Sequence, residues 1–79
     1  MKLPRDVSGA ELVQALGKLG YVPTRQEGSH VRLTRAAPAE QHLTVPAHNP
    51  LRVGTLSSIL RDVSQQTGVE RDELLRMLF

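Results

Sequence analysis

A single glycine, Gly28, constrains the fold most, because it stands between two segments of extended character. Glycine adopts backbone angles that residues with a Cβ disfavour, so the chain can reverse sharply there. After it, Val31 and Leu33 alternate with polar residues, and alternate side chains of a strand point to opposite faces. If these two apolar side chains face the core, His30 and Arg32 lie together on the open face. The pattern predicts a hairpin with a histidine and an arginine on its open side.

Apolar stripes with helical spacing flank this hairpin. Ser8 and Glu11 have the spacing of a capping box, which marks the start of the first helix, and Gly20 is a natural stop for it. The predicted helices cover residues 8–19, 55–66 and 69–79. The last of these is short and begins with an acidic turn.

Three segments between the first two helices predict strands. They cover residues 21–27, 30–35 and 41–46. The loops between them are too short for crossovers, so antiparallel pairing is expected. Pro23 cannot donate a ladder hydrogen bond, which places the first strand at an edge or bends it there. The predicted fold class is α+β: a helix, a three-stranded antiparallel sheet, a helix and a short C-terminal helix, with the helices on one sheet face and the other face open.

Length and composition narrow the possible functions. A chain of 79 residues predicts a single domain over residues 1–79, too small for a deep pocket, so function should lie on a surface or in a shallow groove. The absence of cysteine excludes disulfides and cysteine metal sites and fits a reducing cytosol. No apolar run is long enough for a transmembrane helix or a signal peptide. We therefore expect a cytoplasmic protein without a membrane partner.

Charge is distributed unevenly along the chain. Residues 1–35 carry six basic and three acidic residues, whereas the remainder carries four basic and five acidic residues. A basic half suggests a polyanionic partner, although small domains also acquire such imbalance by chance. Tyr21 and Phe79 are the only aromatic residues, so a platform for stacking bases is absent. Contacts by shape to phosphates and 2′-hydroxyls are the expected mode of RNA recognition.

His30 is the best catalytic candidate. Histidine titrates near neutrality, so it can take or give a proton at working pH. In RNA cleavage a base removes the proton of the ribose 2′-hydroxyl, which attacks the adjacent phosphate, and an acid protonates the departing 5′-oxygen. Arg32 on the same face and Arg25 across the turn are placed to stabilise the charge that grows on the phosphate. A lone strand histidine is, however, commonly an ordinary exposed side chain.

The remaining histidines and the neighbouring serine carry weaker signals. Strand alternation also puts His42 on the open face, where we interpret it as a solvent-exposed strand residue. His48 lies in a loop and could be a second proton-transfer group or, with more support, a loop anchor. The three histidines lack helical spacing, so we expect no metal. Ser29 and His30 point to opposite faces, which disfavours a serine nucleophile, and Ser29 instead donates to a phosphate or fixes the turn.

Four segments occur in an order that is more specific than any one of them. They are residues 16–21, residues 25–30, residues 45–48 and residues 54–61. As an ordered set they resemble the HicA (YcfA-like) family of mRNA interferase toxins. The resemblance implies a fold similar to double-stranded-RNA-binding domains and cleavage of mRNA without a metal or other cofactor. It also implies a HicB-like antitoxin that binds the protein and masks its site.

The resemblance also assigns roles to residues. The family's catalytic histidine is that of the Gly-Ser-His motif, which corresponds to His30. Many members carry a second histidine directly after it, where this chain has Val31, a residue expected to face the core, so we do not interpret the change as inactivation. Strand parity, charge and the turn together give the expected RNA contacts, which are Lys2, Arg25, Gly28, Ser29 and Arg32.

Two alternatives compete with the nuclease interpretation. A non-catalytic double-stranded-RNA-binding module would bind RNA through its arginines in a salt-sensitive way, with or without His30. An interaction domain would instead dock a partner on its helical stripes, and it would show no RNA affinity and an apolar surface patch.

Overall fold

A computed structural model describes residues 3–79 and confirms the predicted α+β fold class. Its three strands form one antiparallel sheet in the order β1-β2-β3. The elements are α1 (Gly9–Leu16), a 3₁₀ turn η1 (Gly17–Leu19), β1 (Val22–Glu27), β2 (His30–Arg35), β3 (Gln41–Pro46), α2 (Val53–Thr67) and α3 (Arg71–Leu78).

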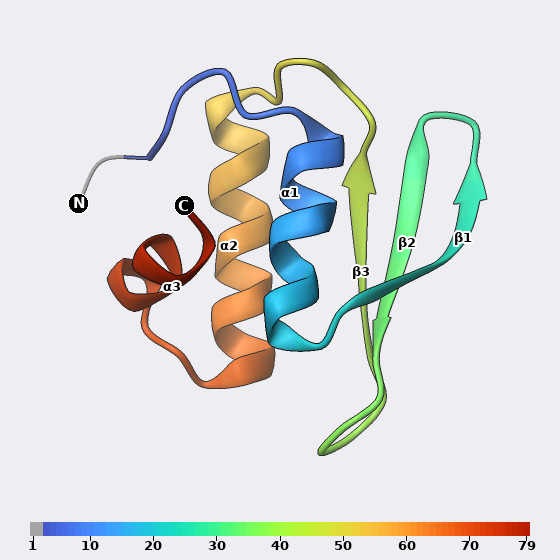
Figure 1. Cartoon of the computed structure of the whole chain (residues 1–79), viewed down its shortest axis with the longest axis vertical. Helices are drawn as coiled ribbons and strands as arrows, with labels where there is room; N and C mark the ends of the chain where they lie inside the picture. The colour runs from blue at the N-terminus through green and yellow to red at the C-terminus, as the bar shows by residue number, and fades with distance from the viewer. Residues whose placement is uncertain (1–2) are drawn as a thin grey trace.

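The helices cover one face of the sheet and leave the other open. Figure 1 shows α1 and α2 side by side next to the sheet, with α3 at the outer side of α2. Leucines and valines from all three helices and from β2 and β3 fill the space between the layers. The fully buried members include Leu12, Leu16, Leu33, Val45, Leu56, Leu60, Val63 and Leu74. Every residue of β1, in contrast, is exposed.

The first helix starts as predicted and ends earlier. Ser8 Oγ accepts a hydrogen bond from the Glu11 amide at 3.0 Å, and the Ser8 amide donates to Glu11 Oε1 at 3.1 Å, so the capping box is present. α1 stops at Leu16, and the chain continues as a 3₁₀ turn, because glycine at position 17 weakly supports a helix interior. Gly20, with φ of 92°, then ends the turn at the predicted place.

Other element boundaries differ from the sequence prediction by one or two residues. The strands of residues 30–35 and 41–46 are confirmed. The second helix begins at Val53 instead of residue 55. The residue before it, Arg52, is the N-cap, and its extended backbone (φ −67°, ψ 144°) marks the boundary. The first strand begins at Val22, because Tyr21 turns into the core and is only 1% exposed. Pro23 lies on an edge strand, as predicted, and the register shifts just after it.

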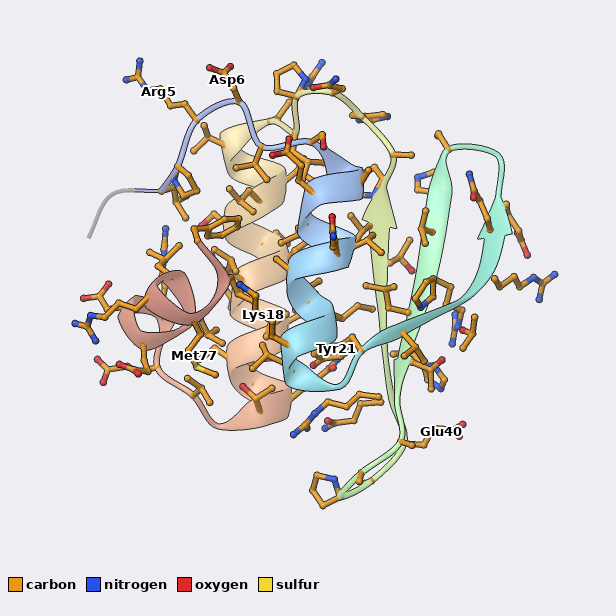
Figure 2. All side chains as sticks on the ribbon, in the orientation of Figure 1. Arg5, Asp6, Lys18, Tyr21, Glu40 and Met77 are labelled. Atoms are coloured by element: carbon orange, nitrogen blue, oxygen red, sulfur yellow. The ribbon has the colours of Figure 1, made fainter. Side chains whose placement is uncertain are left out.

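Tyr21 and Arg35 form hydrogen bonds between the sheet and the helices at the end of the sheet remote from the β1–β2 turn. The Tyr21 hydroxyl donates to Gln66 Oε1 in α2 at 2.7 Å, and Figure 2 shows Tyr21 where the chain passes from α1 to β1. Arg35 Nε donates to the Leu19 carbonyl at 3.0 Å, with its guanidinium carbon 6.0 Å from the centre of the Tyr21 ring. Burial raises the pKa of the Tyr21 hydroxyl, and the nearby Arg35 charge offsets part of that rise.

Three backbone hydrogen bonds hold the segment that follows β3. The Gly9 amide donates to the His48 carbonyl at 2.8 Å, and the Leu51 amide donates to the Val7 carbonyl at 2.7 Å. The Ala47 amide donates to the Ser29 carbonyl at 2.5 Å. The segment therefore links the β1–β2 turn to the start of α1, and it fixes the turn relative to the helical layer.

We expect Gly9→Ala to destabilise the fold, because a Cβ at Gly9 would overlap the Pro46 carbonyl oxygen and contact Ala47 Cα at 3.0 Å. Overpacking against a fixed backbone costs about 1–3 kcal/mol. Gly54→Ala is the matched control in the first turn of α2, where a Cβ meets open space. It should be neutral or stabilise the fold by up to about 1 kcal/mol. Urea unfolding of both variants checks this, and equal midpoints would contradict it.

Candidate active site

A hollow of about 350 Å³ lies on the open face of the sheet, beside the β1–β2 turn. Three strands contribute to it. Its lining residues are Arg25, Glu27, His30, Arg32 and Thr44. All five are exposed to solvent, so a ligand can reach them without movement of the fold.

Strand register brings these side chains to one face. Glu27 pairs with His30 across the hairpin, and Arg25 pairs with Arg32, whose partner on the other side is Thr44. Paired residues of antiparallel strands point to the same side of the sheet. The structure thus brings together His30, Arg32, which the sequence predicted on the same open face, and Arg25, which it predicted across the turn.

The turn itself has the geometry that its glycine predicts. Gly28 has φ of 56°, whereas Ser29 is not among the residues of positive φ, which is the pattern of a type II′ hairpin turn. Such a turn matches the twist of the flanking strands and fixes their register. The register from Gly28 onward therefore sets which side chains face the hollow.

The charges in the hollow are mixed. Arg25 Nη2 lies 2.6 Å from Glu27 Oε1, and the two side chains are 70% and 66% exposed. Arg32 forms no ion pair within residues 3–79. The hollow therefore holds one paired guanidinium, one unpaired guanidinium, a carboxylate and an imidazole. The guanidinium groups can bind a phosphate, and the other two groups can transfer protons to or from the oxygens beside it.

The other predicted site residues lie outside this lining. Gly28 and Ser29 form the exposed turn at the edge of the hollow, where the Ser29 carbonyl accepts a hydrogen bond from the Ala47 amide. The His48 carbonyl bonds to the start of α1, and its ring does not line the hollow. Lys2 lies outside the described residues.

His42 belongs to a different part of the open face. Its Nδ1 lies 3.0 Å from Thr34 Oγ1, which in turn lies 2.9 Å from Thr24 Oγ1. Its Nε2 is 4.0 Å from Glu40 Oε2, and Figure 2 shows Glu40 at the end of the sheet remote from the β1–β2 turn. A row of polar side chains therefore runs across the three strands, separate from the hollow.

Sequence reasoning missed Glu27 and Thr44 as lining residues. A signal for Glu27 was present, because counting back across a two-residue turn pairs residue 27 with residue 30. A carboxylate repels a phosphate, however, so charge and the turn pointed to the basic residues and to Gly28 and Ser29 instead. Thr44 depends on the register between β2 and β3, and the loop of residues 36–40 does not reveal that register in the sequence.

Neither a metal-ligand cluster nor a membrane helix is found in the described part of the chain. Within residues 3–79 no three histidine, aspartate or glutamate side chains gather closely enough to hold a metal ion. Over the same residues no helix has the length and apolar character needed to cross a membrane.

A three-stranded antiparallel sheet with helices on one face defines an α+β protein with the double-stranded-RNA-binding type of fold, and its open face carries His30. Comparison with family models identifies it as a toxin of a toxin–antitoxin system. The model described as HicA toxin of bacterial toxin-antitoxin matches residues 9–64, and the chain belongs to this family. No curated protein and no solved structure matches the chain. The predicted family is confirmed, and the matched region contains every residue that lines the hollow.

Proposed function

We propose that this toxin is an endoribonuclease that cleaves mRNA by histidine acid–base catalysis without a metal cofactor. The observation that carries the proposal is the hollow in which His30 lies with Arg25 and Arg32. A histidine supplies proton transfer near neutrality, and two guanidinium groups bind and stabilise a phosphate whose charge grows during attack. The family membership supports the same conclusion.

The roles of the remaining residues follow from their positions. Arg32 is the principal phosphate contact in this proposal, because it has no acidic partner within residues 3–79. Arg25 binds a second phosphate oxygen through the guanidinium N–H groups that do not contact Glu27. The exposed turn of Gly28 and Ser29 contacts the backbone of the RNA, and Lys2 adds positive charge.

A HicB-type antitoxin neutralises the toxin in this proposal by covering the hollow. The site is an open, shallow surface and not a closed pocket, so a protein partner can block it directly. In this proposal the toxin acts in the cytoplasm, where its mRNA substrate is translated.

Induced expression tests the proposed function. We expect wild-type protein to arrest bacterial growth, with loss of full-length mRNA and with RNA fragments that end in a 2′,3′-cyclic phosphate and begin with a 5′-hydroxyl. Coexpression of a cognate antitoxin should restore growth. Growth and intact mRNA in the presence of soluble wild-type protein would contradict the proposal.

A non-catalytic RNA-binding module is the second candidate, favoured by the exposed arginines on the open face. It predicts salt-dependent RNA binding by purified protein with no cleavage product, and binding that is unchanged in His30→Ala.

A further inference from the structure

Proton transfer in RNA cleavage needs two groups, and the hollow contains two that suit it. Of its five lining residues, only His30 and Glu27 carry a side chain of the kind that serves as a general acid or base, since arginine stays charged and a threonine hydroxyl is a poor base. His48 does not line the hollow, and His42 is bonded to Thr34 elsewhere on the sheet. The second group is therefore to be sought at Glu27.

The position of Glu27 suits a partner of His30. The two residues pair directly across the hairpin, on either side of the Gly28–Ser29 turn. Cβ atoms of such pairs are about 4.5–5.5 Å apart on one face. No ion pair joins the two side chains within residues 3–79, so neither of them blocks the other from a substrate between them.

The contact with Arg25 orients the carboxylate. Arg25 Nη2 lies 2.6 Å from Oε1 of Glu27, and no hydrogen bond within residues 3–79 occupies Oε2. An ionised carboxylate only accepts hydrogen bonds, whereas a protonated imidazole only donates them. The two groups thus differ in kind, as a base and an acid must.

We propose that Glu27 is the general base and His30 the general acid of the cleavage reaction. This inference rests on the proposed endoribonuclease function. Glu27 takes the proton of the ribose 2′-hydroxyl as the 2′-oxygen forms a bond to phosphorus. The bond from phosphorus to the 5′-oxygen breaks, and His30 gives that oxygen its proton. The products are a 2′,3′-cyclic phosphate and a 5′-hydroxyl, and exchange with water restores both side chains.

The test uses the purified full chain and an RNA oligonucleotide containing a cleavage site mapped with wild-type protein. The oligonucleotide is made with the natural 5′-oxygen at the scissile bond and, separately, with sulfur in its place. A thiolate departs without a proton, so the sulfur substrate needs a base but no acid. The variants are Glu27→Gln and His30→Ala. Glu40→Gln is the matched control, an exposed glutamate remote from the hollow.

We expect Glu27→Gln to lower kcat on natural RNA by about 10²–10⁴-fold, the usual contribution of general base catalysis. KM should not rise, because the change frees Arg25 for phosphate. The sulfur substrate should leave this defect in place, whereas it should restore His30→Ala by at least about tenfold, and Glu40→Gln should match wild type.

Two results would overturn the inference while leaving the nuclease function intact. One is cleavage by Glu27→Gln at or above the wild-type rate, which would mean that the carboxylate only neutralises Arg25. The other is rescue of Glu27→Gln by the sulfur substrate, which would place Glu27 on the leaving-group side. Failure of wild-type protein to cut any RNA would instead overturn the proposed function, and this inference with it.

Discussion

Purified His30→Ala should cleave RNA about 10²–10⁴-fold more slowly than wild type while it remains folded. The size of the effect follows from the removal of a proton-transfer group, because Arg25, Arg32 and Thr44, which also line the hollow, cannot take over that role. The fold should be unaffected, because His30 is exposed and makes no side-chain hydrogen bond within residues 3–79. Exposed substitutions of this kind change the free energy of unfolding by about 0.5 kcal/mol or less.

Initial rates on a mapped oligonucleotide, together with thermal unfolding, measure both halves of this expectation. His42→Ala is the matched control, since it removes a histidine from the same sheet face at a position bonded to Thr34 and outside the hollow. It should cleave at close to the wild-type rate. Equal loss of activity in the two variants, or full activity in His30→Ala, would exclude His30 as the proton-transfer group.

Much of the fold could be predicted because local patterns and tertiary packing agree. The capping box at Ser8 and Glu11 marked the start of α1, and the alternation around Leu33 identified the face of β2 that packs on the helices. Prediction failed at the ends of elements, where the side chains do not follow the periodic pattern of burial. Val53 begins α2 with an exposed side chain, so the periodicity of the buried residues could not mark the true start of the helix.

The candidate site was predictable only in part, for a related reason. Strand parity predicted that Arg32 shares the face of His30, and the turn predicted that Arg25 lies across from it. Counting outward from Gly28 gives the pairs that the hairpin has near its turn. The same count holds only up to Arg25, because the register shifts between Pro23 and Arg25. Parity within one strand therefore identifies the face of a residue, whereas its neighbours on other strands depend on bulges and loop conformations that the sequence does not display.

Leu33 and Arg32 are adjacent in β2, but Leu33→Ala should lower stability whereas Arg32→Ala should lower only RNA binding. Leu33 is fully buried against the helical layer, and leucine-to-alanine changes at such sites cost about 2–5 kcal/mol. The whole free energy of unfolding of a chain of this size is on the order of 4–12 kcal/mol. We expect Leu33→Ala to lower the urea midpoint severely or to unfold the protein, and to lose activity for that reason.

Arg32→Ala should instead keep the stability of wild type within about 0.5 kcal/mol, because its side chain is exposed and unpaired within residues 3–79. Its loss should weaken RNA binding and reduce the slope of log affinity against log salt by about 0.7, the value for one phosphate contact on a single strand. Binding is measured by fluorescence anisotropy in the His30→Ala background, which prevents cleavage. An unchanged salt slope would show that Arg32 does not contact phosphate, and a large loss of stability would show that β2 does not present Leu33 and Arg32 to opposite faces.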